Sequence, residues 1–151
     1  MTVERESSLV VRLKREIRAT PECVWEVIGT FEGLLKWLAV RTFEPRIGGR
    51  TLFDAEHEGK RWLMFGTVAT FDAARELAFT WREVDTQKLT VWPADTLVRV
   101  VLTPQENGTL VELIHSGFEA LSDAQEQYAG YSDGWASLND LEELARMCEA
   151  Q

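Results

Sequence analysis

The chain has 151 residues, of which 45% are hydrophobic and 27% charged, a balance typical of a folded domain rather than a disordered segment. Its net charge of −9 disfavours nucleic-acid backbones and anionic membrane surfaces as partners. The longest apolar stretch, residues 62–71, is too short to cross a bilayer, which takes about 20 apolar residues.

The first third of the chain predicts one strand followed by two short helices. Apolar residues alternate over residues 9–17, as expected for a half-buried strand. Thr20 and Pro21 then begin a helix, because threonine caps the first free amides and proline has no amide hydrogen to leave unpaired. Gly29 is expected to end this helix, and a second helix is predicted over residues 33–38.

From residue 42 onward the pattern changes to strands. Gly48-Gly49 and Asn107-Gly108 mark tight turns, since both pairs tolerate positive φ. Strands joined by tight turns must be antiparallel, because parallel neighbours need a long crossover. The predicted strands cover residues 42–47, 50–57, 62–71, 77–84, 96–103 and 109–117.

The last segment predicts a single long helix over residues 123–149, with Ser122 and Gln125 as a capping box. At 1.5 Å per residue it would run ~40 Å, enough to cross the sheet. Its first half is aromatic and contains Gly130 and Gly134, which indicate either close packing or permitted movement, since each costs about 1 kcal/mol relative to alanine. We expect the aliphatic second half to anchor the helix and the aromatic half to border a cavity or to fill a tapered core. The apolar stripe comprises Tyr128, Tyr131, Trp135, Leu138, Leu141, Ala145 and Cys148.

Six local motifs in this order of elements resemble the START-like, or SRPBCC, helix-grip superfamily. Within it the chain is similar to the branch related to the C-terminal domain of the heat-shock protein 90 ATPase activator (Aha-type). The resemblance implies an α+β fold of the helix-grip (START/Bet v-like) type. Its curved six- to seven-stranded antiparallel sheet would wrap on a long C-terminal helix, with two short helices after the first strand. The motifs are ATPECVW at 19–25, LKWL at 35–38, FEPRIGGR at 43–50, LAFTWR at 77–82, HSGF at 115–118 and GW at 134–135.

Functions within that superfamily are diverse, so the resemblance implies a cavity more firmly than any chemistry. Its members bind lipids, hormones or polyketides between sheet and helix, a few catalyse cyclisation or dehydration, and some are co-chaperones. We expect one domain over residues 1–151, without the additional N-terminal domain of eukaryotic co-chaperones. The leading hypothesis is therefore a carrier or sensor of a small hydrophobic or aromatic molecule rather than an enzyme. A co-chaperone-like interaction module and a cyclase or dehydratase are the alternatives.

Alternation along the strands and spacing along the helix predict which side chains line the cavity. Aromatic faces suit a flat or greasy ligand, with a few polar groups fixing its orientation. His115 could transfer a proton, because histidine titrates near neutrality. At a strand end, however, histidine is more often structural, or else contacts a ligand, so we assign no catalytic residue. The predicted ligand-binding residues are Trp37, Phe53, Phe65, Phe79, Trp81, His115, Tyr128, Tyr131 and Trp135.

Several further expectations concern partners and chemistry. Residues 119–151 carry eight acidic residues against Arg146 alone, which predicts a solvated helix face or a contact for a basic protein. Cys23 and Cys148 are far apart in sequence and are expected to be reduced, and the chain shows no metal-ligand or cofactor motif. The first residues lack the apolar core of a signal peptide, so a cytoplasmic location is expected. Trp92, in a loose segment, is expected to be exposed as a dimer contact or a pocket lid, leaving monomer and homodimer both open.

Overall fold

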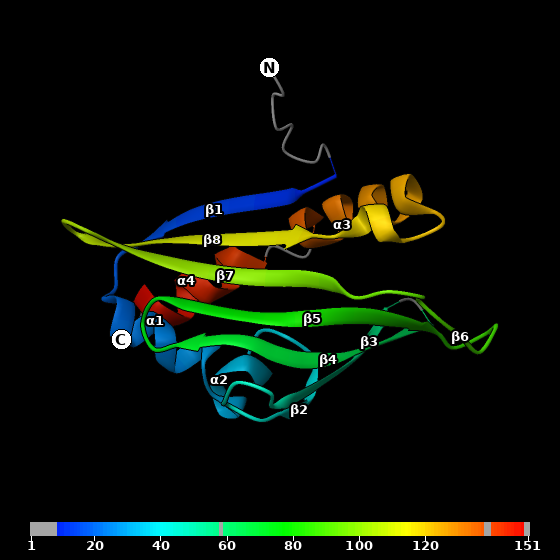
Figure 1. Cartoon of the computed structure of the whole chain (residues 1–151). Helices are drawn as coiled ribbons and strands as arrows, with labels where there is room; N and C mark the ends of the chain where they lie inside the picture. The colour runs from blue at the N-terminus through cyan, green and yellow to red at the C-terminus, as the bar shows by residue number, and fades with distance from the viewer. Residues whose placement is uncertain (1–8, 58, 138–139, 150–151) are drawn as a thin grey trace, which may run out of the picture.

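The computed structural model describes residues 9–57, 59–137 and 140–149 and shows a curved antiparallel sheet with helices packed on its inner side (Figure 1). The predicted α+β helix-grip architecture is confirmed. The strands are β1 (Val11–Ile17), β2 (Val40–Phe43), β3 (Arg50–His57), β4 (Lys60–Asp72), β5 (Glu76–Asp85), β6 (Thr90–Val91), β7 (Thr96–Gln105) and β8 (Gly108–Ser116). The helices are α1 (Pro21–Ile28), α2 (Phe31–Leu35), the 3-10 helix η1 (Phe118–Ala120), α3 (Ala124–Ser137) and α4 (Asp140–Glu149).

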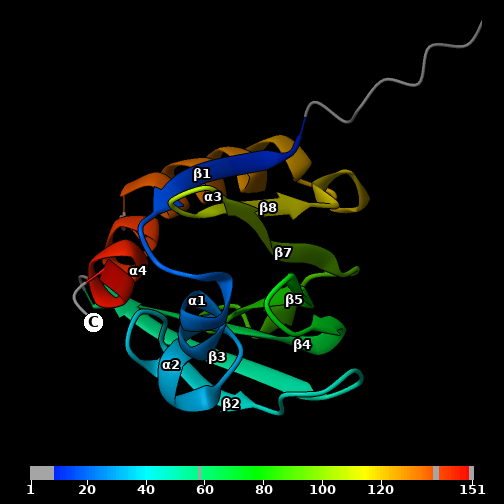
Figure 2. The same cartoon turned by 90° about the vertical axis from the view of Figure 1, so that its left-hand side faces the viewer.

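The sheet has the order β1-β8-β7-β5-β4-β3-β2, and the short β6 pairs with β5. Every pairing is antiparallel, as the tight turns predict. The first strand lies beside the last, with Val11 opposite His115 and Ile17 opposite Thr109. Figure 2 shows the strands bending in an arc from β1 to β2, with α1 and α4 inside the arc. The inner face of the sheet is therefore the place where a buried site can form.

The first helix begins and ends as its sequence predicts. Thr20 Oγ1 accepts the amide of Cys23 at 3.2 Å, Pro21 occupies the first helical position, and the Gly29 amide donates to the Trp25 carbonyl at 2.7 Å. The second helix differs from the predicted 33–38. It begins at Phe31, because Thr30 caps it by accepting the amide of Gly33 at 3.0 Å.

Gly33 is the point of closest approach between α1 and α2. A Cβ at this position would lie 2.3 Å from the Glu26 carbonyl oxygen and 2.6 Å from Val27 Cα, and both are backbone atoms that side-chain motion cannot relieve. Gly33→Ala is therefore expected to lower the free energy of unfolding by about 1–3 kcal/mol, although alanine is the better helix former. Urea unfolding measures this loss. An unchanged midpoint would show that α1 and α2 separate at little cost.

The second strand is shorter than the predicted 42–47, since β2 ends at Phe43 and a loop follows. Pro45 cannot donate a ladder hydrogen bond, which disfavours continuing the strand. Glu44 instead folds the loop back, because its Oε1 accepts the Arg50 amide at 2.8 Å and the Arg50 Nε at 3.2 Å. These hydrogen bonds lower the pKa of Glu44 to about 2.

The C-terminal segment is helical over α3 and α4, which cover most of the helix predicted over 123–149 (Figure 2). Residues 138 and 139, between the two, lie outside the described residues. Helix α4 is strongly amphipathic and packs against β1 and α1, whereas α3 is only weakly amphipathic. The expected anchor is confirmed for the buried residues Leu144, Ala145 and Cys148, while Leu138 lies outside the described residues and the side chain of Leu141 is not described.

Candidate functional site

Aromatic side chains from the inner face of the sheet meet those of α3 in one group, which we name the ring cluster. Its centre is Trp81 on β5, whose ring centroid lies 5.0–6.1 Å from those of five neighbouring rings. Such separations are those of rings in direct contact. The ring cluster comprises Phe53, Phe79, Trp81, Trp92, His115, Phe118, Tyr128, Tyr131 and Trp135.

Seven of the nine predicted ligand-binding residues belong to the ring cluster, and two do not. Trp37 is buried beneath α1, where its indole N–H donates to the Val27 carbonyl at 3.2 Å. The interior position predicted for Phe65 is wrong, because its side chain is 39% exposed. Side chains alternate along a strand, and β4 turns Met64 and Val68 inward, so Phe65 points outward.

The ring cluster also contains Trp92 and Phe118, which were not predicted to bind a ligand. The exposure expected for Trp92 is wrong. Trp92 is buried rather than exposed, with its ring centroid 5.7 Å from that of Tyr131. Phe118 is fully buried and lies 4.5 Å from the His115 ring, because Gly117 takes a left-handed conformation (φ 96°) that turns the chain back over the sheet. The glycine at the end of β8 is the sequence feature that could have indicated this reversal.

His115 is fully buried and has both ring nitrogens in hydrogen bonds. Trp135 Nε1 lies 3.1 Å from His115 Nδ1, and an indole N–H can only donate, so Nδ1 carries no proton. Thr96 Oγ1 lies 2.8 Å from Nε2 and donates to the Trp81 carbonyl at 2.7 Å, so it accepts the proton of Nε2. The network therefore holds a neutral imidazole in the Nε2–H tautomer.

The same surroundings keep His115 from acting as a base. Burial lowers the pKa of His115 from 6.5 to about 3. Protonation would also bring a new Nδ1–H against the indole N–H of Trp135, so that two donors would face each other. The lone pair needed for proton abstraction is thus occupied and sealed from water. The geometry supports the structural role for His115 and gives no support to His115-dependent cyclisation.

The hydroxyl of Tyr131 joins α3 to the sheet. It accepts the indole N–H of Trp81 at 2.9 Å and donates to Glu83 Oε1 at 2.7 Å. Burial, followed by the negative charge of Glu83, raises the pKa of Tyr131 well above 10, so the phenol remains a donor. Glu83 lies two residues beyond Trp81 on β5, and continuing the predicted alternation would have placed it on the inner face.

Helix α3 is held on the sheet by few groups. Tyr128, Tyr131 and Trp135 supply its aromatic contacts with the ring cluster. A Cβ added to Gly130 or Gly134 would meet no atom within 4 Å, so close packing does not explain these glycines. They lower the intrinsic stability of the helix by about 1 kcal/mol each relative to alanine. The docking of α3 therefore depends on its three aromatic side chains, the Tyr131 hydrogen bonds and the hydrogen bond from Trp135 to His115.

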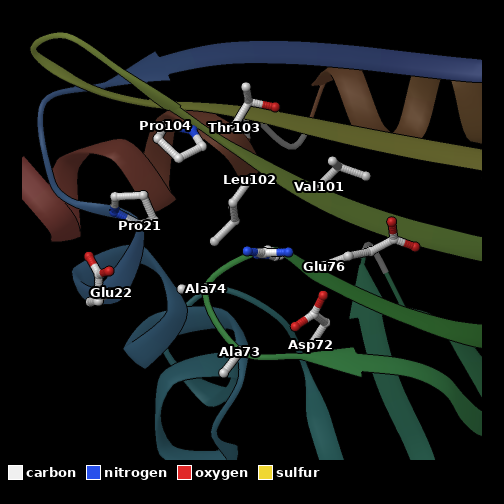
Figure 3. A pocket seen from close by; sticks show the side chains of 11 residues that line it. Pro21, Glu22, Asp72, Ala73, Ala74, Glu76, Val101, Leu102, Thr103 and Pro104 are labelled. Carbon is white, nitrogen blue, oxygen red and sulfur yellow. The ribbon is translucent and has the colours of Figure 1, made fainter.

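Two concavities described by the structure lie outside the ring cluster. Figure 3 shows a groove of about 690 Å³ between the start of α1, the turn at 72–76 and the end of β7. Asp72 and Glu76 lie on one side of this groove and Glu22 on the other (Figure 3). A second groove, of about 1060 Å³, follows β1 and the turn after β7. Neither contains any of the nine predicted residues, and the Trp81 ring is in contact with rings from β3, β5, β8 and α3.

The acidic C-terminal face is partly neutralised within the chain. Glu142 on α4 lies 2.9 Å from Arg15 on β1, and Glu143 lies 3.4 Å from Arg146. The Glu149 carboxylate accepts the amide of Arg18 at 2.9 Å. Glu142 and Glu149 therefore help to hold α4 against β1 and the residue that follows this strand, whereas the pair of Glu143 with Arg146 lies within α4.

Both cysteines lie outside the ring cluster. Cys23 and Cys148 are free thiols, and burial is the main cause that raises the pKa of Cys148 to about 11, so its thiol stays protonated. Among residues 9–57, 59–137 and 140–149, no three histidine, cysteine or carboxylate side chains are grouped to hold a metal ion. No helix in this part of the chain is long and apolar enough to cross a membrane, and the cytoplasmic location stays a prediction.

Comparison with known proteins agrees with this architecture. A family model described as "Activator of Hsp90 ATPase homolog 1-like protein" matches residues 18–146. None of the curated proteins matches the chain.

Solved structures share the fold at low sequence identity. Protein CV1439 from Chromobacterium violaceum is 24% identical with a TM-score of 0.75, covering 95% of this chain and 99% of that one. The Aha1 dimer from Colwellia psychrerythraea is 20% identical with a TM-score of 0.66, covering 93% and 96%. DynU16, a protein of the dynemicin biosynthetic locus, is 19% identical with a TM-score of 0.69, covering 93% of this chain and 47% of that one. At these identities the likeness concerns the fold alone.

Proposed function

The chain belongs to the family of activator of Hsp90 ATPase homolog 1-like proteins, and from this premise we propose that it binds a small aromatic or apolar molecule between the sheet and α3. One feature of the molecule carries this proposal: the ring cluster is covered by a helix whose interior glycines pack against nothing. Aromatic faces supply apolar contact, and the Tyr131–Glu83 pair supplies directional hydrogen bonds for a polar group on the ligand.

Binding against Trp81 requires displacement of α3, because Tyr131 and Trp135 of this helix are in direct contact with the Trp81 ring in the described conformation. A ligand stabilises the displaced conformation only by as much as it prefers that conformation over the closed one. Gly130 and Gly134 weaken α3 by about 2 kcal/mol relative to alanine, which corresponds to roughly a 30-fold larger open population. Tyr131 and Trp135 would separate from Trp81, and the ligand would take over their contacts.

Tryptophan fluorescence provides the direct test, because Trp81, Trp92 and Trp135 all lie in the ring cluster. Titration with a panel of fatty acids, sterols and aromatic polyketides should change the emission saturably for at least one class. Native mass spectrometry of the purified chain should detect a retained molecule if one co-purifies. The proposal fails if no apolar compound changes the emission and no bound mass is found.

Stiffening α3 should oppose ligand entry. The double variant Gly130→Ala/Gly134→Ala is expected to raise the free energy of unfolding by about 1–2 kcal/mol, since both added methyl groups face open space. Ligand affinity should fall by roughly tenfold, because the closed state gains that stability. Thermal unfolding and calorimetric titration measure the two effects. A stabilised variant with unchanged affinity would show that binding does not require displacement of α3.

A second candidate function is a co-chaperone-like interaction module, which the filled interior and the acidic exposed residues Glu119 and Glu126 favour. Stimulation of the ATPase of heat-shock protein 90 by the purified chain is the direct assay. Stimulation that is lost on charge reversal of Glu119 and Glu126 would support it. If the purified chain does not change the ATPase rate, or if charge reversal does not change the stimulation, this role of the acidic face is excluded.

A further inference from the structure

The outward face of the sheet carries a group of apolar side chains that the ring cluster does not use. We name it the outer patch, and it consists of Leu52, Leu63, Phe65, Val84 and Val91 on β3 to β6. Its members are contiguous, because Leu52 lies opposite Phe65, Leu63 opposite Val84, and Val84 opposite Val91. The side chains of Phe65 and Val91 are 39% and 48% exposed. Figure 2 shows α1 and α4 on the inner side of the curved sheet, so the outer patch faces away from these helices.

This composition departs from that of an ordinary solvated sheet face. An antiparallel sheet with one face in water alternates apolar residues inward with polar residues outward. On the neighbouring half of the same outward face, Arg99 on β7 forms two hydrogen bonds with Glu76 on β5, and the apolar Leu97 and Val101 are only partly exposed. On β3 to β6, apolar residues lie on both faces and Phe65 and Val91 are exposed. A contiguous exposed apolar patch is typical of an interaction surface.

The charge distribution indicates which partner fits. The chain carries −9, and residues 119–151 account for −7 of this, with eight acidic residues against Arg146. Their helices α3 and α4 lie on the inner side of the sheet. The rim of the outer patch carries both signs. Arg82 lies 2.7 Å from Asp95, and Arg61 lies 2.8 Å from Asp54. A surface of mixed sign can complement a second copy of itself, and facing patches keep the two acidic helical layers far apart, where solvent and salt screen their repulsion.

We propose that the outer patch is the interface of a homodimer in which the outward faces of β3 to β6 of two copies pack together. A two-fold arrangement brings the same residues of both copies into contact and buries Phe65 and Val91 against their counterparts. The interface would also lie next to the ring cluster, since Trp92 follows Val91 directly and packs on Tyr131. Dimer formation does not depend on whether the ring cluster binds a ligand.

Sedimentation equilibrium of the full chain, at about 5 to 500 µM, tests the proposal. The wild-type chain should approach twice its monomer mass of 17.2 kDa as concentration rises. The double variant Phe65→Ser/Val91→Ser should raise the dissociation constant more than about tenfold, because these side chains supply the most exposed apolar contact of the strands. Raising salt from about 50 to about 500 mM should strengthen the dimer by screening repulsion between like-charged copies.

The matched control is Leu35→Ser, which removes an apolar side chain that is 54% exposed on α2, away from the outer patch. Its dimer constant should equal that of the wild type. Circular dichroism and the thermal midpoint establish that each variant is folded. A wild-type chain that stays monomeric throughout this range would overturn the proposal and leave the outer patch to a different protein. A dimer that persists in Phe65→Ser/Val91→Ser would place the interface elsewhere and overturn it equally.

Discussion

Lowering the pH from about 7 to about 4 is expected to reduce the free energy of unfolding by roughly 3 kcal/mol, because His115 is protonated in the unfolded chain but stays neutral in the folded one. Burial lowers the pKa of this histidine to about 3 in the folded chain, whereas an unfolded chain has a value near 6.5. Below pH 6.5 the unfolded chain therefore binds more protons than the folded one. The stability is fully present above pH 6.5 and is lost progressively as the pH falls towards 3.

Urea unfolding at a series of pH values measures this loss, and two observations assign it to His115. The variant His115→Gln, which lacks the imidazole, should lose this part of the pH dependence. Nitrogen-15 spectra of the folded chain should keep the neutral Nε2–H tautomer of His115 down to about pH 4. Glu44 contributes to the loss of stability only at lower pH, because its stabilising hydrogen bonds are lost as the pH falls from 4.5 towards 2. An imidazole of His115 that titrates near pH 6.5 in the folded chain would contradict the network.

Trp81→Ala is expected to cost about 3–5 kcal/mol of unfolding free energy, the range for removing a buried tryptophan. The side chain is only 4% exposed and touches rings from β3, β5, β8 and α3. Its loss also removes the N–H that Tyr131 accepts. Because Trp81 connects the sheet to α3, the helix should become more accessible, and amide hydrogen exchange in residues 124–137 should accelerate.

The matched control for this large loss is Phe65→Ala, an aromatic truncation in the same sheet on the outward face. Phe65 is 39% exposed, so its removal should cost about 1 kcal/mol or less in the monomer. Urea unfolding at low protein concentration gives both values. Equal losses for Trp81→Ala and Phe65→Ala would show that the ring cluster contributes no more than an ordinary surface residue.

Strand alternation predicts much of the ring cluster from the sequence. Leu77, Phe79 and Trp81 face inward as expected, and so does His115 on β8. The error at Phe65 arises because an apolar residue is not by itself evidence of an inward direction. Its neighbour Met64 takes the inward position, and the partner strands determine that choice.

Other parts of the site depend on contacts that no local pattern contains. Trp92 lies in a segment without periodicity, and its burial results from packing on Phe118 and Tyr131, which come from later elements. Thr96 becomes part of the site because it lies opposite Trp81 and within reach of His115. The sequence also does not indicate how completely the aromatic side chains fill the interior between the sheet and the helix. A filled interior and an open cavity can share the same aromatic residues.

The pairing of β1 with β8 has a consequence for how the chain is assembled during synthesis. Val11 and His115 are opposite each other yet about a hundred residues apart, so β1 has no sheet neighbour until β8 has been made. At translation rates of about 5–20 residues per second, β1 remains unpaired for several seconds before β8 is synthesised. Such long-range pairing slows folding, because the loop must close before the contact is gained. The His115 network must form still later, since Trp135 follows on α3, and newly made chains therefore expose the inner aromatic surface until translation is nearly complete.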